Sequence, residues 1–108
     1  MKIRTDRQDG LVLVSVAGPV DLTASGSLSS GLGSAIADAV AEGRSRVVVD
    51  LSGVGFLDSS GINALVGAYR SGRSRGVAVS VVNAAGTVRR TMEVVGVYRV
   101  LGGTDPVR

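Results

Sequence analysis

Apolar and polar positions along the chain switch between two periods, which predicts strands and helices in turn. Leu11–Ala17 is rich in valine and leucine and stops at the turn signal Gly18-Pro19, so we predict a strand there. Lys2–Thr5 is predicted to pair with this strand through an Asp9-Gly10 turn. Val47–Leu51 is a nearly continuous apolar run, typical of a strand that is buried on both faces. We therefore expect Val47–Leu51 at the centre of a sheet.

Three segments have helical periodicity. In Thr23–Glu42 the apolar positions recur every fourth residue and Gly43 offers a stop. A second helix is predicted from Ser59 to about Arg70, and a third over Ala85–Val95. The apolar faces predicted for the three helices are Leu28, Leu32, Ile36 and Val40, then Ile62, Leu65, Val66 and Tyr69, then Val88, Met92 and Val95.

Two more strands complete the predicted pattern. Val77–Val82 follows a turn flanked by Gly72 and Gly76, and Val97–Leu101 is predicted as a last strand. Strands and helices in this order predict an α/β fold. We expect a mixed sheet of about five strands with parallel crossovers, packed with three or four helices. The chain has 108 residues, the size of one core, so we predict a single domain over residues 1–108.

Composition excludes several classes of protein. The chain has no cysteine and no histidine, which removes thiolate sites, the commonest metal ligand and the usual general base. A Ser-His-Asp hydrolase is excluded, and we expect no metal and no cofactor. The net charge is +3, but only 3% of residues are aromatic, so direct binding of nucleic acid is not expected. No apolar run is long enough to cross a membrane, and the start does not resemble a signal peptide, so we expect a cytoplasmic protein.

The junction Asp58-Ser59-Ser60-Gly61 joins the predicted central strand to the second helix and carries two hydroxyl groups. Asp58 is a candidate N-cap for this helix. A helix N-terminus has unpaired backbone N–H groups and a positive dipole end, so it would favour a phosphate on a serine of the first turn. Taken alone, this run is also compatible with ordinary capping.

The flanking residues carry a resemblance to a known family. Val47–Ile62 resembles the central signature of STAS domains, in particular of the bacterial anti-sigma-factor antagonists. Val16–Asp21 resembles the Gly-x-hydrophobic-Asp turn that follows the second strand in that family. The resemblance covers nearly the whole chain.

The resemblance implies an anti-sigma-factor antagonist that is not itself an enzyme. Such a protein binds an anti-sigma factor that is also a serine kinase, and thereby releases a sigma factor in stress-response or sporulation signalling. The kinase inactivates the antagonist by phosphorylating the serine before the glycine of the motif, here Ser60, and a metal-dependent serine phosphatase reverses the reaction. The implied partner-binding residues are Asp21, Asp58, Ser59, Ser60 and Gly61.

Alternatives remain open at this point. In one alternative, the chain is a STAS scaffold or interaction module of a larger signalling or transport assembly, and Ser60 is never modified. In the other, the chain is an enzyme with Ser60 as nucleophile, but it has no histidine to act as the base. Asp21 can equally stabilise its own turn or the first helix, and Asp50 is expected to be structural. Pro19 stands where many relatives have glutamate, and relatives commonly continue beyond the segment 102–108 into another helix.

Overall fold

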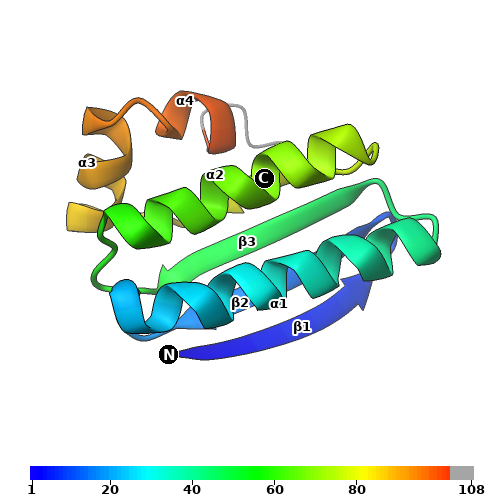
Figure 1. Cartoon of the computed structure of the whole chain (residues 1–108), viewed down its shortest axis with the longest axis horizontal. Helices are drawn as coiled ribbons and strands as arrows, with labels where there is room; N and C mark the ends of the chain where they lie inside the picture. The colour runs from blue at the N-terminus through cyan, green and yellow to red at the C-terminus, as the bar shows by residue number, and fades with distance from the viewer. Residues whose placement is uncertain (103–108) are drawn as a thin grey trace.

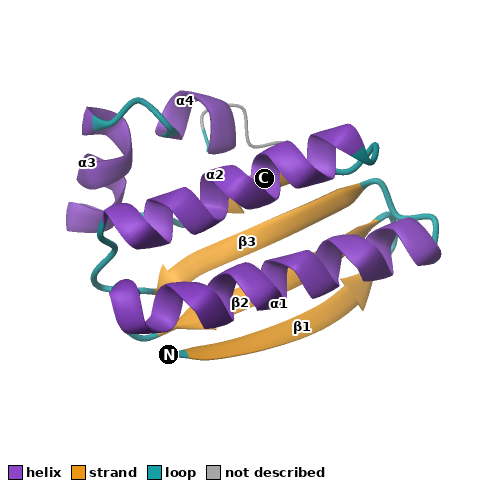
Figure 2. Cartoon of the chain, viewed as in Figure 1, coloured by secondary structure: helices purple, strands orange, loops and turns teal. Residues whose placement is uncertain are grey.

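The computed structural model describes residues 1–102 and shows a four-stranded sheet with two long helices packed side by side on one face (Figure 1). Two shorter helices follow β4 and lie beside the N-terminal half of α2 (Figure 2). The elements are β1 Lys2–Gln8, β2 Leu11–Ala17, α1 Leu22–Ala41, β3 Arg46–Gly53, α2 Ser59–Ser74, β4 Ala78–Val82, α3 Gly86–Val94 and α4 Tyr98–Leu101.

The strands lie in the order β1-β2-β3-β4, which is also their order in the chain. β1 and β2 form an antiparallel hairpin, whose tight turn requires the left-handed φ of +75° at Gly10. β2 pairs with β3, and β3 with β4, in parallel, with α1 and α2 as the crossovers. The structure confirms the α/β class, the mixed sheet and the central place of the Val47–Leu51 strand.

Alternation along the strands separates the two faces of the sheet. Every second residue of β2 and β3 points toward the helices and is buried with the apolar face of α1. The predicted core positions Leu28, Leu32 and Ile36 are buried, whereas Val40 is 43% exposed. Ala39 takes the core position instead, because a helix of 3.6 residues per turn drifts away from a strict four-residue repeat. The sheet residues of the core are Val12, Val14, Val16, Val47, Val49, Leu51, Val79 and Val81.

The predicted fifth strand over Val97–Leu101 is wrong. The amide of Leu101 donates to the carbonyl of Val97, and Tyr98–Leu101 forms the short helix α4. Gly96, at a φ of +85°, ends the preceding helix and turns the chain. Leu101 is buried while Val97 is partly buried against the core, a spacing of four that suits a helix. The sheet therefore has four strands, and the helices number four within residues 1–102.

The second helix is longer than predicted. α2 continues to Ser74, and Gly72 lies inside it rather than in a turn. A Cβ at Gly72 would lie 2.7 Å from the carbonyl oxygen of Val77 and 2.7 Å from a methyl group of Val79. Glycine thus lets the last turns of α2 pack directly against the start of β4. By contrast, Gly67 lies on the exposed side of α2, where a Cβ would have no neighbour within 4 Å.

This contrast generates a matched pair of substitutions. We expect Gly72→Ala to lower the free energy of unfolding by about 1–3 kcal/mol, because backbone and core atoms must move. Gly67→Ala should leave stability unchanged or raise it by up to about 1 kcal/mol, because alanine favours the helix. Urea denaturation of both variants measures the difference. Equal midpoints for the two variants would contradict the close packing of α2 on β4.

Candidate functional site

The N-termini of α1 and α2 lie next to each other at one end of the sheet (Figure 1). An isolated parallel bridge between Val20 and Leu57 joins the loops that precede them. The amide of Val20 donates to the carbonyl of Phe56 at 2.9 Å, and the amide of Asp58 donates to the carbonyl of Val20 at 3.2 Å. Both loops follow the carboxyl ends of parallel strands, the usual location of sites in open α/β sheets.

Asp58 is the N-cap of α2, as predicted. One carboxylate oxygen, Oδ1, accepts hydrogen bonds from the amides of Ser60 at 3.0 Å and Gly61 at 3.2 Å. The Ser60 hydroxyl donates to the same oxygen at 2.5 Å. A phosphate on Ser60 would therefore remove one donor of Asp58 and compete with its carboxylate for the other two. The N-terminus of α2 is an anion site that is already occupied by a side chain of the protein.

Asp21 repeats this arrangement at the start of α1. Its Oδ1 accepts from the amides of Thr23 at 3.1 Å and Ala24 at 3.2 Å, and from the Thr23 hydroxyl at 2.7 Å. The structure thus assigns Asp21 as the N-cap of the first helix. The carboxylate is also close enough to Asp58 for its charge to act on the pKa of Asp58. Both roles that the sequence left open for Asp21 are therefore compatible with its position.

Hydrogen bonding lowers the pKa of both capping carboxylates. For Asp58 the largest cause is the hydrogen bond from the Ser60 hydroxyl, followed by partial desolvation, which opposes it, and by the backbone bonds from Gly61 and Ser60. The neighbouring charge of Asp21 also raises the pKa of Asp58, as the smallest cause. For Asp21 the largest cause is the bond from the Thr23 hydroxyl. Each carboxylate is therefore ionised at neutral pH.

The three residues after Asp58 differ in exposure. Ser59 is exposed, Ser60 is half-buried and Gly61 is buried. A Cβ at Gly61 would lie 2.5 Å from a methyl group of Leu57 and 2.8 Å from one of Val20. Gly61 therefore lets α2 start against the bridge between the two loops, so its position indicates a packing role. Ser59 and Ser60 supply the hydroxyl groups that reach the surface.

Two exposed apolar side chains flank the capping residues. Leu22, next to Asp21, is 76% exposed, and Phe56, two residues before Asp58, is 52% exposed. We did not predict these residues as part of the site. Leu22 lies off the repeat of Leu28 and Leu32, and Phe56 is the only phenylalanine of the chain and lies in a Gly/Ser-rich loop, so both signals were present in the sequence. Exposed apolar side chains beside a polar site are typical of protein interfaces.

Asp50, which the sequence analysis expected to be structural, makes its hydrogen bonds to neighbouring residues of the protein. Its Oδ1 accepts from the amide of Ser52 at 2.9 Å and from the side-chain amide of Asn83 at 3.1 Å, and thus ties the end of β3 to the chain after β4. Pro19 is exposed in the loop before α1.

Within residues 1–102, no group of three or more acidic side chains is arranged to hold a metal ion. No helix of this part of the chain is long and apolar enough to cross a membrane.

Comparison with known proteins assigns the family. The family model of the STAS domain matches residues 2–107. The chain belongs to the STAS domain family. No curated protein sequence matches it significantly.

Solved structures agree with the assignment. An anti-sigma factor antagonist from Mycobacterium paratuberculosis is 28% identical, with a TM-score of 0.76 over 94% of this chain and 82% of that one. The Bacillus cell fate determinant SpoIIAA in its phosphorylated form is 18% identical, with a TM-score of 0.63 over 93% and 88%. The murine anion transporter Slc26a9 is 25% identical, with a TM-score of 0.70 over 87% of this chain but 15% of the transporter. STAS domains thus occur both in anti-sigma factor antagonists and in transporters.

Substitution of Ser60 tests the hydrogen bonds that converge on Oδ1 of Asp58. Ser60→Ala removes the hydroxyl donor, so the pKa of Asp58 should rise toward the ordinary aspartate range. Thr23→Ala is the matched control, because it should raise the pKa of Asp21 and leave that of Asp58 nearly unchanged. Carboxyl ¹³C chemical shifts followed through a pH titration report both groups.

The same shift predicts a pH dependence of stability. A carboxylate whose pKa is lowered on folding stabilises the protein above the pKa of the unfolded chain, and this contribution is lost as pH falls through the folded pKa. Ser60→Ala should therefore weaken the acid dependence of stability. An unchanged pKa of Asp58 in Ser60→Ala would contradict the hydrogen-bond network.

Proposed function

We propose that this STAS domain is an anti-sigma-factor antagonist that is controlled by phosphorylation of Ser60. The unmodified protein binds an anti-sigma factor with serine kinase activity and so releases a sigma factor. The kinase phosphorylates Ser60 and ends the interaction, and a metal-dependent serine phosphatase restores it. The protein acts in the cytoplasm and has no catalytic activity of its own.

The observation that carries this proposal is the position of Ser60. Ser60 is half-buried at the start of α2, next to the N-terminus of α1, and the exposed side chains of Leu22 and Phe56 belong to the two segments that form this junction. A partner that covers Leu22 and Phe56 would also cover Ser60. The likeness to the antagonist from Mycobacterium paratuberculosis supports a protein partner of the anti-sigma class.

Desolvation explains how phosphorylation would end the interaction. The surface around Ser60 already carries the charges of Asp21 and Asp58, and the unmodified Ser60 hydroxyl is satisfied by Asp58 at 2.5 Å. A phosphate adds roughly −1.5 to −2 charges to this acidic surface and cannot be covered by an apolar partner without a large cost. Repulsion by Asp58 and Asp21 also directs the phosphate outward, toward the partner. The fold itself need not change.

The known phosphorylated form of SpoIIAA supports the compatibility of this fold with such a modification. The likeness to Slc26a9 favours a second candidate function, in which the domain is an unmodified interaction module of a transport assembly.

The two candidate functions differ in whether Ser60 accepts a phosphate. They are separated by incubating the protein with ATP and a serine-kinase anti-sigma factor encoded in the same genome, and measuring the intact mass. The proposal predicts one added phosphate, located on Ser60 by fragmentation.

Substitutions at Ser60 test the switch. Ser60→Asp should weaken binding to the anti-sigma factor at least tenfold, which corresponds to about 1.4 kcal/mol. Ser60→Ala should bind but gain no phosphate. Ser71→Ala is the matched control, since it removes an exposed hydroxyl near the other end of α2 and should behave as wild type in both assays. Equal binding by the Asp and Ala variants of Ser60, measured by titration calorimetry, would contradict the switch.

The exposed apolar side chains Leu22 and Phe56 provide an independent test of the proposed binding surface. Phe56→Ala should weaken binding by about tenfold or more, because a large aromatic side chain at the centre of an interface contributes most of its energy. Val40→Ala removes a side chain that is 43% exposed near the C-terminal end of α1, away from the two helix N-termini, and should have little effect. If both variants bind like wild type, the partner does not cover the surface around Ser60.

A further inference from the structure

The second face of the sheet carries a surface that the proposed function does not use. Both long helices lie on one face (Figure 2), so the alternate strand residues point the other way. Among them Val48 is only 1% exposed, although it is not part of the core beneath the helices. Its neighbours across the sheet, Leu13 and Ser80, are half-buried. The middle of this face is thus more enclosed than an ordinary solvated sheet surface.

Two polar atoms on the same face are left without partners. Nη2 of Arg46 and Oγ of Ser80 are buried and have no hydrogen bond to any residue of the described part, 1–102. Such groups are uncommon in native proteins because each costs the free energy of its lost hydration. Both atoms are already enclosed by the chain itself, so they distinguish this face from a solvated sheet surface but do not by themselves indicate a partner.

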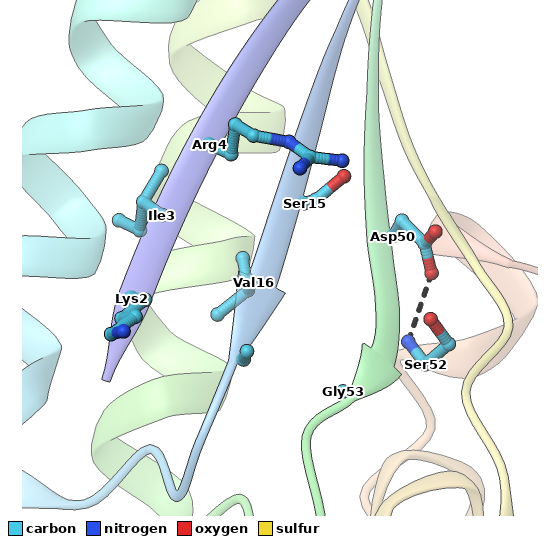
Figure 3. Close-up of a pocket in the computed structure, with 9 residues that line it drawn as sticks. Lys2, Ile3, Arg4, Ser15, Val16, Asp50, Ser52 and Gly53 are labelled. Carbon is cyan, nitrogen blue, oxygen red and sulfur yellow. Dashed lines mark hydrogen bonds between the residues drawn. The ribbon is translucent and has the colours of Figure 1, made fainter.

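Charges on this face are arranged in a row across three strands. Arg4 of β1 pairs in register with Ser15 of β2, and Ser15 pairs with Asp50 of β3. Figure 3 shows the Arg4 side chain crossing β2, so that its guanidinium lies beside the Ser15 hydroxyl, with Asp50 on the neighbouring strand. An open trough of about 580 Å³ extends along these strands to Lys2 and Ser52. The row therefore carries a cation that starts from β1 and an anion on β3, along an open trough.

We propose that this face binds the same face of a second copy of the chain. A two-fold axis parallel to the strands and above β2 places β1 over β3 of the partner and keeps each row in register. Arg4 then meets the partner's Asp50, and Asp50 meets the partner's Arg4. A surface whose two ends carry opposite charges is complementary to itself under such an axis.

The same axis sets the positions of the other side chains of the face, and Asp6, in register with Leu13 and Val48, comes over the partner's Val48 while it stays beside Arg4. Leu13 and Ser15 each meet their own counterparts at the centre, which gives an apolar contact and leaves room for the long arginines. Gln8, in register with Leu11 and Arg46, comes opposite the partner's Arg46. Sheets pack about 10 Å apart, a distance that an arginine and an aspartate span together.

The dimer should be weak. Three strands of each copy face the partner across this axis, and at about 4.8 Å apart and roughly 17 Å long they give about 245 Å² of flat area per copy, less than the ~800 Å² of a standard interface. The exposed ion pair of Arg4 with Asp6, at 3.7 Å, competes only slightly with the contact to the partner. We expect a dissociation constant on the order of 0.1 mM. Ser60 lies at the start of α2, on the helix layer, so both copies keep it accessible and the inference is independent of the proposed function.

Sedimentation equilibrium over about 10 µM to 1 mM tests the proposal. Wild type should pass from monomer to dimer over this range. Arg4→Glu alone and Asp50→Lys alone should each stay monomeric, because like charges then face each other at both ends of the row. An equimolar mixture of the two variants should dimerise at least as well as wild type, because both pairs become opposite in sign again. Only a two-fold contact between Arg4 and Asp50 predicts this recovery.

A second variant is needed because the change at Asp50 also removes the hydrogen bond from the amide of Ser52 and could affect folding. Ser15→Arg places two cations at the centre of the contact and should abolish dimerisation. Ser29→Arg adds the same charge at an exposed position of α1 and should dimerise like wild type. Circular dichroism verifies the fold of each variant. A wild type that stays monomeric to 1 mM, or a mixture that fails to recover while both variants are folded, overturns the proposal.

Discussion

Two backbone hydrogen bonds between Val20 and the residues around Leu57 hold the site together. They join the loop before α1 to the loop before α2, two segments that are more than thirty residues apart in the chain. Parallel crossovers place both loops at one end of the sheet, and Gly61 allows α2 to start close to the joined loops. The two helix N-termini, with their capping aspartates, therefore form one surface.

This arrangement separates the proposed switch from the core. Asp58 satisfies the first amides of α2 and also holds the Ser60 hydroxyl, so the helix start does not depend on any external anion. The buried valines of the sheet and the leucines of α1 form the core between the sheet and the helices, and Asp58 and Ser60 are not part of this core. A phosphate on Ser60 changes the charge and hydration of a rim position while the packing of the sheet is kept.

Sequence reasoning succeeded where one local rule determines the outcome. The continuous apolar run of β3 predicted a central strand, and the position of Asp58 before an amphipathic helix predicted its N-cap. The sequence predictions failed where packing between distant parts of the chain determines the local structure. Val97–Leu101 has the composition of a strand, but Gly96 turns the chain and Leu101 packs as one turn of helix. The exposure of Phe56 and the joining of Asp21 to Asp58 depend on contacts between distant loops, which a single sequence does not specify.

The central claim is that the state of one hydroxyl sets partner affinity without altering the fold. It is tested most directly by ¹⁵N NMR titration of the anti-sigma factor into the protein that carries phosphoserine at position 60, with the unmodified protein beside it. The phosphate should shift amide signals only near Val20–Ala24 and Phe56–Ile62, and partner-induced changes should be seen in the unmodified protein alone. Equal partner-induced changes in the two proteins, or shifts throughout the sheet on phosphorylation, would contradict it.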